Sequence, residues 1–140
     1  MPVNFLDSNV VLYSLAKDDA KQLKALELLA SGCVISTQVL NEVANVMRRK
    51  LAYDIDSIRT VLLRLIRTAR LHPVASFTIL LALDIAQRYG FSYYDSLIVA
   101  AAQEADCARL YSEDLQHGQV LESGLMIINP FLSGKSSTAS

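Results

Sequence analysis

The sequence predicts an α/β domain in which a parallel sheet is covered by helices on both faces. Short apolar segments that resemble strands alternate with helical segments along the whole chain, and strands separated by helices favour parallel pairing. Hydrophobic residues make up 52% of the 140 residues, enough for one buried core. No repeat or linker divides the chain, so we expect one domain over residues 1–132. The small polar residues 133–140 are expected to form a disordered tail.

The N-terminal half is expected to contain two strands and four helices. In chain order these are a strand at residues 2–6, a short helix after residue 9, a helix at 18–30, a strand at 33–35, a helix from about 37 to 51 and a helix at 55–69. Ser36 or Thr37 is placed to cap the third helix, and Asp54 or Asp56 to cap the fourth, because short polar side chains accept hydrogen bonds from free N–H groups at helix starts.

The C-terminal half is expected to contain two helices and three strands. In chain order these are a weak strand at residues 72–75, a helix at 76–89 closed by Gly90, a helix that begins after Ser92, a strand at 108–111 and a strand at 125–128. His72 has no plausible ligand partner near it in the sequence, so we expect it to be structural. Asn129-Pro130 ends the last strand.

Basic residues are concentrated in one segment, although the net charge is only −1. Seven of the thirteen lie between residues 48 and 70, opposed only by Asp54 and Asp56. They are Arg48, Arg49, Lys50, Arg59, Arg64, Arg67 and Arg70. The segment is either a surface that contacts phosphates or a pair of solvated helix faces.

The cysteines and the N-terminus bear on the compartment. Cys33 and Cys107 lie in apolar surroundings without metal-ligand spacing, which indicates free buried thiols in a reducing compartment. The apolar N-terminal run has no basic region before it and is interrupted by Asp7, so it is not a signal peptide. No segment has the length of a membrane span. We therefore expect a cytoplasmic protein that does not bind membranes.

Four acids lie where strands end or helices begin. They are Asp7 after the first strand, Glu42 on the helix after the second, Asp95 at a helix start and Asp114 after the fourth strand. Three of them have a structural alternative: Asp7 and Asp95 could cap helices, and Glu42 could be a surface residue paired with its neighbours. Ligands of open α/β sheets bind outside the carboxyl ends of the strands. The acids can therefore meet at one site.

Four segments that carry these acids are FLDSNVVLY, STQVLNEV, YYDSLIVAAA and LYSEDLQHG. With these segments in this order, residues 3–130 resemble the PIN-domain nucleases, and among them the VapC-like ribonuclease toxins of toxin–antitoxin pairs. The resemblance implies a three-layer α/β/α domain with five parallel strands in the order 3-2-1-4-5. It further implies an RNA substrate, an antitoxin partner, a homodimer, and products with a 5′-phosphate and a 3′-hydroxyl.

Clustered carboxylates repel one another unless a cation lies among them, and hard oxygen ligands suit Mg²⁺ or Mn²⁺. We expect Asp7, Asp95 and Asp114 to be metal ligands of a metal-dependent endoribonuclease, with Glu42 acting directly or through water. Ser8 and Ser112 would orient a ligand or a water. Many family members carry a further acid where this chain has Gln116, so the sequence leaves open whether one metal ion or two are bound.

RNA would be bound by the basic segment, first of all by Arg48, Arg49 and Lys50. Three tyrosines, Tyr53, Tyr93 and Tyr94, could stack on bases or pack within the fold. A haloacid-dehalogenase phosphatase would need a second aspartate where this chain has Asn9. The alternative function is a catalytically inactive PIN-like module that binds RNA or protein. The presence of all four acids argues against it.

Overall fold

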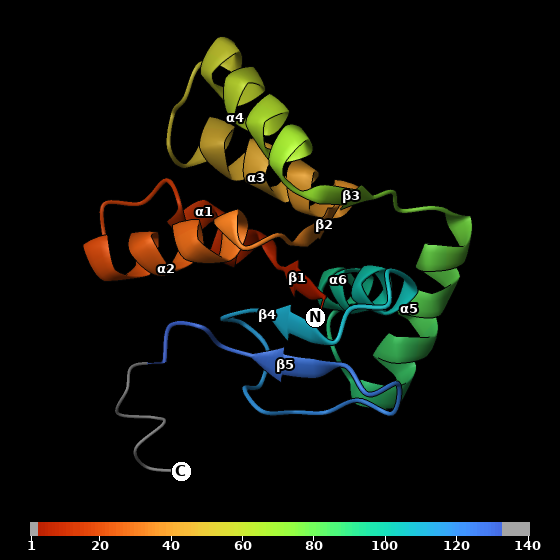
Figure 1. Cartoon of the computed structure of the whole chain (residues 1–140). Helices are drawn as coiled ribbons and strands as arrows, with labels where there is room; N and C mark the ends of the chain where they lie inside the picture. Colours follow the sequence, from red (N-terminus) through yellow and green to blue (C-terminus); the bar gives the residue numbers. More distant parts are fainter. Residues whose placement is uncertain (1–2, 133–140) are drawn as a thin grey trace.

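The computed structural model describes residues 3–132 and contains one five-stranded sheet with the order β3-β2-β1-β4-β5 (Figure 1). All four strand pairings are parallel. The strands are β1 (Asn4–Leu6), β2 (Val34–Ser36), β3 (Arg70–His72), β4 (Arg109–Tyr111) and β5 (Met126–Ile128). The predicted fold class and strand order are confirmed. Because β2 and β4 flank β1 on opposite sides, a ligand site is expected outside the carboxyl end of β1.

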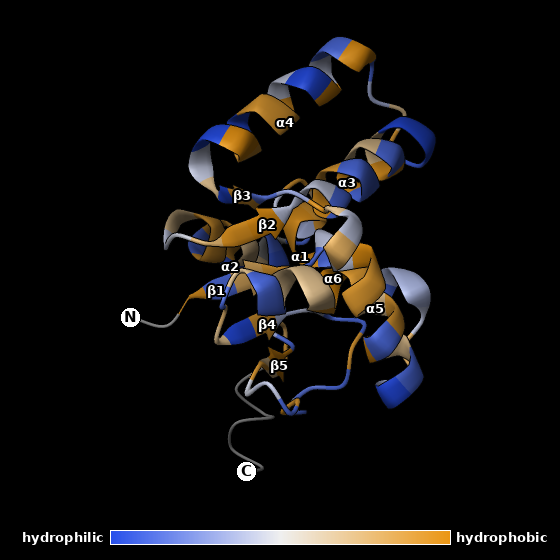
Figure 2. Ribbon diagram, turned by 90° about the vertical axis from the view of Figure 1, so that its right-hand side faces the viewer, coloured by the Kyte–Doolittle hydropathy of each residue, from blue (hydrophilic) through white to orange (hydrophobic). Residues whose placement is uncertain are grey.

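Six helices accompany the sheet in the described part of the chain. They are α1 (Ser8–Tyr13), α2 (Asp19–Ala30), α3 (Thr37–Arg49), α4 (Ile55–Thr68), α5 (Ser76–Tyr89) and α6 (Tyr93–Glu104). In Figures 1 and 2, α3 and α4 lie side by side and project from the end of the molecule near β2 and β3. Figure 2 shows hydrophilic and hydrophobic residues alternating along α4, as expected for a helix with one solvated face.

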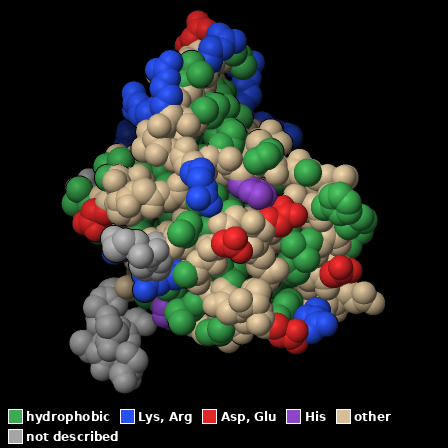
Figure 3. All heavy atoms as spheres, turned by 45° about the vertical axis from the view of Figure 1, so that its right-hand side comes forward, with side chains coloured by type: hydrophobic (Ala, Val, Ile, Leu, Met, Phe, Trp, Pro, Cys, Tyr) green, Lys and Arg blue, Asp and Glu red, His purple; other side chains and the backbone are tan. Residues whose placement is uncertain are grey.

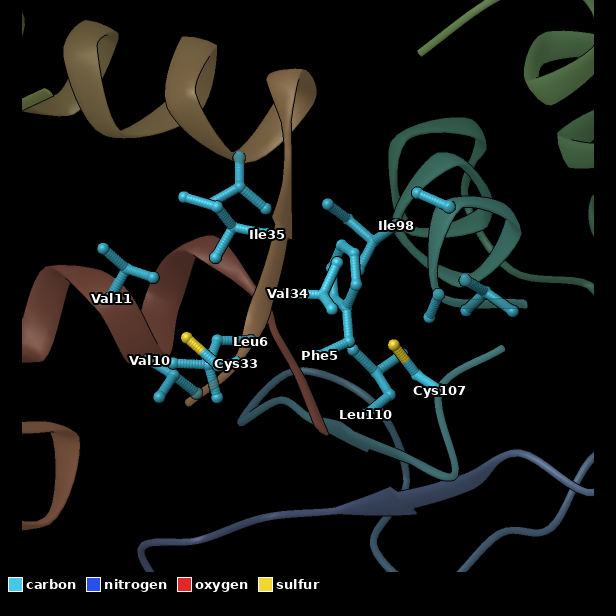
Figure 4. Packing of buried hydrophobic residues seen from close by; sticks show 14 of the residues in the cluster. Phe5, Leu6, Val10, Val11, Cys33, Val34, Ile35, Ile98, Cys107 and Leu110 are labelled. Carbon is cyan, nitrogen blue, oxygen red and sulfur yellow. The ribbon is translucent and has the colours of Figure 1, made fainter. Parts of the chain in front are cut away.

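The core lies on both faces of the sheet because successive strand residues point to opposite sides. Figure 4 shows Phe5 and Val34 close to Ile98 of α6, whereas Leu6 lies on the side of Val10 in α1. These five side chains are at most 2% exposed. In α6 every residue from Ser96 to Ala102 is buried, and its alanines allow close packing against the sheet. The start of α6 is thereby fixed against the strands.

One predicted strand is wrong in position. It was expected at residues 72–75, but the strand is Arg70–His72, and its residues pair with Val34–Ser36 of β2. Pro73 explains the shift, because proline has no N–H group to donate to a strand ladder. His72 is structural, as predicted, with its Nε2 lying 2.8 Å from Oε1 of Glu104.

The predicted caps and thiols agree with the structure. Ser36 caps α3 by accepting from the Val39 N–H at 3.2 Å, and Asp54 caps α4 by accepting from the Ser57 N–H at 2.8 Å. Both cysteines are free and buried. No helix within residues 3–132 is both long and apolar enough to cross a membrane. The predicted disordered tail, residues 133–140, lies outside the described residues.

Candidate active site

Asp7 joins the end of β1 to the start of α1 and is only 4% exposed. Its Oδ1 accepts from the Ser8 N–H at 2.7 Å, so the capping role considered for it is real. Its Oδ2 accepts from the Ser112 hydroxyl at 2.8 Å. Burial raises the pKa of Asp7 to about 6, against the hydrogen bonds from Ser112 and Ser8; the nearby charges of Asp95 and Asp114 also raise it. Asp7 therefore caps α1 with a carboxylate whose ionised form is destabilised by burial.

Ser112 ties the loop after β4 to this carboxylate. Its side chain is fully buried, and its hydroxyl oxygen accepts from the Asp114 N–H at 3.2 Å and from the Leu115 N–H at 3.4 Å while donating to Asp7. The Asp7 N–H in turn donates to the carbonyl of Tyr111 at 3.0 Å. Neighbouring strands β1 and β4 thus place Asp7 and Asp114 at the same edge of the sheet.

Glu42 lies in the second turn of α3 with one carboxylate oxygen turned inward. Its Oε1 is buried and has no hydrogen-bond partner among residues 3–132. Burial is the largest cause that raises the pKa of Glu42 to about 7, and the charge of Asp7 is the next; Asp95 and Asp114 add to it, and a hydrogen bond with Ser8 opposes it. A surface glutamate paired with its neighbours would have neither property. That alternative does not describe Glu42.

Asp95 is the third residue of α6 and is partly buried. Ser92 is the N-cap, as predicted, and its Oγ accepts from the Asp95 N–H at 3.2 Å. Burial raises the pKa of Asp95, the Ser92 hydroxyl lowers it, and the charge of Asp114 raises it further. Asp114 is exposed in the loop that follows β4. Both acids therefore face the region occupied by Asp7 and Glu42.

The four predicted acids are brought together from four separate parts of the chain, since the charges of Asp7, Asp95 and Asp114 all raise the pKa of Glu42. Within residues 3–132, however, no three carboxylate, imidazole or thiol groups are arranged so that they could hold a metal ion as they stand. The unpartnered Oε1 of Glu42 and the mutual repulsion fit a hard divalent cation, which would relieve both.

The other predicted residues lie at different distances from these acids. The Ser8 hydroxyl is 3.4 Å from Oδ1 of Asp7 and therefore belongs to the site. Arg48, Arg49 and Lys50 are exposed at the end of α3, roughly 9 to 12 Å along the helix axis from Glu42. Figure 3 shows Lys and Arg side chains gathered over the projecting end of the molecule. The basic group thus flanks the acids rather than joining them.

Two groups of residues were not predicted. Asn9 accepts from the Glu113 N–H at 3.2 Å, and the Glu113 carboxylate accepts from the Tyr13 hydroxyl at 2.8 Å and from Lys21 Nζ at 2.7 Å. No local pattern indicates contacts between residues about a hundred positions apart. The second group lines a cavity of about 400 Å³ beside the acids. It comprises Gln38, Asn41 and Asn45, which line the cavity together with Glu42 and Tyr94, two residues that the sequence does predict. The spacing of its amides along α3 is a pattern in the sequence that could have placed them on one face of this helix.

The family model described as PIN domain matches residues 5–120. A comparison of the sequence with curated proteins found no match. Solved structures do match.

The toxin VapC20 of Mycobacterium tuberculosis, which cleaves the sarcin-ricin loop, is 20% identical with a TM-score of 0.66; the match covers 79% of this chain and 89% of that one. A toxin–antitoxin complex from Klebsiella pneumoniae is 15% identical with a TM-score of 0.68, covering 92% and 98%. VapBC2 of Rickettsia felis, bound to a DNA fragment of its promoter, is 19% identical with a TM-score of 0.64, covering 89% and 96%. At these identities the likeness establishes the fold.

Proposed function

The chain belongs to the PIN domain family, and from this membership we propose that it is a metal-dependent endoribonuclease, the toxin of a toxin–antitoxin pair. One observation supports the proposal most strongly: four carboxylates from distant parts of the chain gather at the carboxyl edge of the sheet, where one is almost fully buried and another has an unpartnered oxygen. Such an arrangement is costly for a fold that has no cation to bind.

We assign the roles of the residues as follows. Asp7, Asp95 and Asp114 would hold Mg²⁺ or Mn²⁺, and Glu42 would act directly or through water. When bound, the ion supplies charge neutralisation at the phosphodiester and activates a water. Ser112 fixes the orientation of Asp7 and of the backbone at Asp114 through the hydrogen bonds described above. Ser8 supports Oδ1 of Asp7 from the other side.

The substrate class follows from the charge distribution. The exposed Arg48, Arg49 and Lys50 carry positive charge on the helix that also bears Glu42, so an RNA backbone bound there passes close to the acids. Single-stranded or looped RNA is the form whose backbone can bend into such a site. The likeness in fold to a toxin that cleaves the sarcin-ricin loop supports this class. Hydrolysis would leave a 5′-phosphate and a 3′-hydroxyl.

The proposed partners are an antitoxin and a second copy of the chain. A structure of similar fold, from Klebsiella pneumoniae, is a toxin–antitoxin complex, which supports the antitoxin as a partner. A groove of about 260 Å³ between α2 and α4, lined partly by Leu15, Leu26 and Val61, offers an apolar surface for a partner protein. Toxin, antitoxin and RNA would meet in the cytoplasm.

The proposal is tested by incubating total RNA and tRNA with the purified protein and with Asp95→Asn, each in Mg²⁺, Mn²⁺ or EDTA. We expect discrete cuts that require the metal and disappear in the variant. The variant should unfold at a temperature close to that of the wild type, since Asn retains the N–H group that Ser92 accepts from. Metal-dependent cleavage by Asp95→Asn at the wild-type rate would refute the assignment. A protein that is stabilised by metal but cuts no RNA would support the inactive binding module.

A further inference from the structure

We propose that the cavity beside Glu42, between α3 and α6, binds one unpaired adenine base of the RNA and thereby selects where the chain is cut. This inference rests on the proposed function, which does not itself specify any base. The cavity measures about 400 Å³ and lies next to the acids, since Glu42 is one of its lining residues. A nucleotide adjacent to the cleaved bond can therefore reach it.

The lining of the cavity favours a base over a phosphate. Three of its residues, Gln38, Asn41 and Asn45, carry neutral amides, and its lining contains no lysine or arginine from the described part of the chain. The carboxylate of Glu42 would repel a phosphate group at the same place. A nucleobase is neutral and presents donors and acceptors along its edge, so it meets the amides without this repulsion.

The amides are free to read such an edge. They lie at positions 38, 41 and 45, spacings that bring them to one face of α3. No side-chain hydrogen bond within residues 3–132 engages these three amides; the cap nearest to them is the one at Ser36, which accepts from the Val39 N–H. An asparagine or glutamine amide pairs with the N6 and N7 atoms of adenine through two hydrogen bonds. Adenine is therefore the base we expect.

Tyr94 supplies a surface for stacking on the opposite wall of the cavity. It is 59% exposed, so its ring is available to a ligand. Its ring centroid lies 5.5 Å from that of Tyr93 at an angle of 63°, an edge-to-face contact that limits its orientation. Stacking on an aromatic ring depends little on which base is bound. Tyr94 would thus contribute affinity, and the amides would contribute the choice of base.

The test measures binding of four short homopolymer RNAs, of A, C, G and U, by fluorescence anisotropy in EDTA, where metal-dependent cutting cannot occur. We expect the wild type to prefer the adenine polymer by about tenfold. The double variant Asn41→Leu/Asn45→Leu should lose this preference and leave binding of the other three RNAs nearly unchanged. The variant Tyr94→Leu should weaken binding of all four RNAs by about tenfold, and Tyr94→Phe should retain the wild-type affinity.

Two controls separate base recognition from other effects. Gln87→Leu removes an amide from an exposed position on α5, next to a different cavity, and should change nothing. Arg49→Gln should weaken all four RNAs equally and reduce the dependence on salt. The thermal midpoint of every variant is recorded. Because all five exchanged positions are exposed on helices, we expect midpoints close to that of the wild type.

Cavity variants that bind all four RNAs as the wild type does would overturn the inference, as would a wild type without preference for any base. Unchanged RNA selectivity combined with weaker binding of the antitoxin would overturn it in favour of a protein ligand. The nuclease proposal fails separately: a wild type that prefers adenine but cuts no RNA in Mg²⁺ or Mn²⁺ refutes cleavage and supports the base pocket. A wild type that cuts RNA while the variants keep its base preference refutes only the pocket.

Discussion

Asp7 and Glu42 hold their protons more tightly than ordinary carboxyl groups, since their pKa values are raised to about 6 and about 7, chiefly by burial. A group whose pKa is higher in the folded than in the unfolded chain stabilises the fold fully below its unfolded pKa. That stabilisation is lost as the pH rises through the folded pKa. For these two groups the stabilisation is lost between about pH 4 and about pH 7. The metal-free protein should therefore lose stability across this range.

The variant Glu42→Gln tests this effect, because it removes the charge and keeps the shape. In EDTA at pH 8 we expect it to be more stable than the wild type by about 1 kcal/mol, a value reduced by solvent screening at this partly exposed site. At pH 4 the difference should vanish, since Glu42 is then protonated. Urea unfolding at a series of pH values measures both. Glu27→Gln, an exposed position on α2, is the control, and a less stable Glu42→Gln at pH 8 would contradict the account.

Ser112 is the residue on which the geometry at Asp7 and Asp114 depends. Ser112→Ala leaves Oδ2 of Asp7 without its donor and the N–H groups of Asp114 and Leu115 without an acceptor. We expect a loss of about 1–3 kcal/mol in the free energy of unfolding. The pKa of Asp7 should rise further, because the hydrogen bond from Ser112 lowers it.

Urea unfolding at pH 7 measures the loss for Ser112→Ala, and NMR titration of the Asp7 carboxyl carbon measures the pKa. Ser76→Ala is the matched control, since Ser76 is exposed at the start of α5 and its loss should change stability by less than about 0.5 kcal/mol. Equal effects of the two exchanges would show that Ser112 has no special part in the site.

At the residue scale the sequence predicts positions better than contacts. That Asp7 follows a strand and that Asp95 stands three residues after a cap can be read from local patterns, and both are observed. The hydrogen bond between Ser112 and Asp7 joins residues 105 positions apart, so no local pattern contains it. Only the resemblance to a family indicated a role for Ser112. The burial of one oxygen of Glu42 depends on how α3 packs against the rest of the fold, so the sequence left open whether this residue was an ordinary surface glutamate.

Among the elements, α3 combines the two properties that the proposed function requires. Its second turn carries Glu42, and its last turn and C-cap carry Arg48, Arg49 and Lys50. One rigid helix therefore fixes the distance between an acid of the site and the basic group. An RNA strand held at the end of α3 would be presented to the acids in a defined register.

Exchange of Arg48, Arg49 and Lys50 for glutamine should weaken RNA binding, because the protein then neutralises fewer phosphates and binding releases fewer counterions from the RNA. The slope of log affinity against log salt should fall by about 0.7 for each phosphate contact that is lost. Fluorescence anisotropy at several salt concentrations measures this slope. Lys17→Gln, at an exposed position between α1 and α2, should leave the slope unchanged. A triple variant with the wild-type slope would exclude this turn from the RNA surface.

Most helices could be predicted because their caps and apolar faces are local signals. The helix α5 was predicted with both its bounds, and it ends at Gly90, whose φ of 74° suits a residue without a Cβ atom. The strands are only three residues long, so their bounds depend on pairing with neighbours. This is why the strand next to Pro73 was placed two residues too late.

For the whole molecule, the strand order is what turns four scattered acids into one site. Because β1 lies between β2 and β4, the segments that leave these strands meet at one edge. The position of α6 against the sheet adds Asp95 to the same region. The order itself was implied by the resemblance; alternation of strands and helices indicates only that the sheet is parallel.

The proposed homodimer has a candidate surface on α5. Phe77, Leu80 and Leu83 are 77%, 56% and 51% exposed on this helix, an apolar stripe that water contacts in the single chain. We expect the wild type to have twice the mass of one chain in light scattering, and Leu80→Glu to have the mass of one chain. Leu23→Glu, at an exposed leucine on α2, is the control. A dimer that persists in Leu80→Glu would place the interface elsewhere.

The most direct test of the carboxylate site is calorimetric titration of Mg²⁺ and Mn²⁺ into the wild type, Asp7→Asn and the control Asp84→Asn, an exposed acid on α5. We expect the wild type and the control to bind the metal and to release protons near pH 6.5, because the groups with raised pKa values must ionise as the ion binds. Asp7→Asn should bind about tenfold more weakly or worse. Binding by Asp7→Asn equal to that of the wild type, or no binding by any of the three, would contradict the metal site.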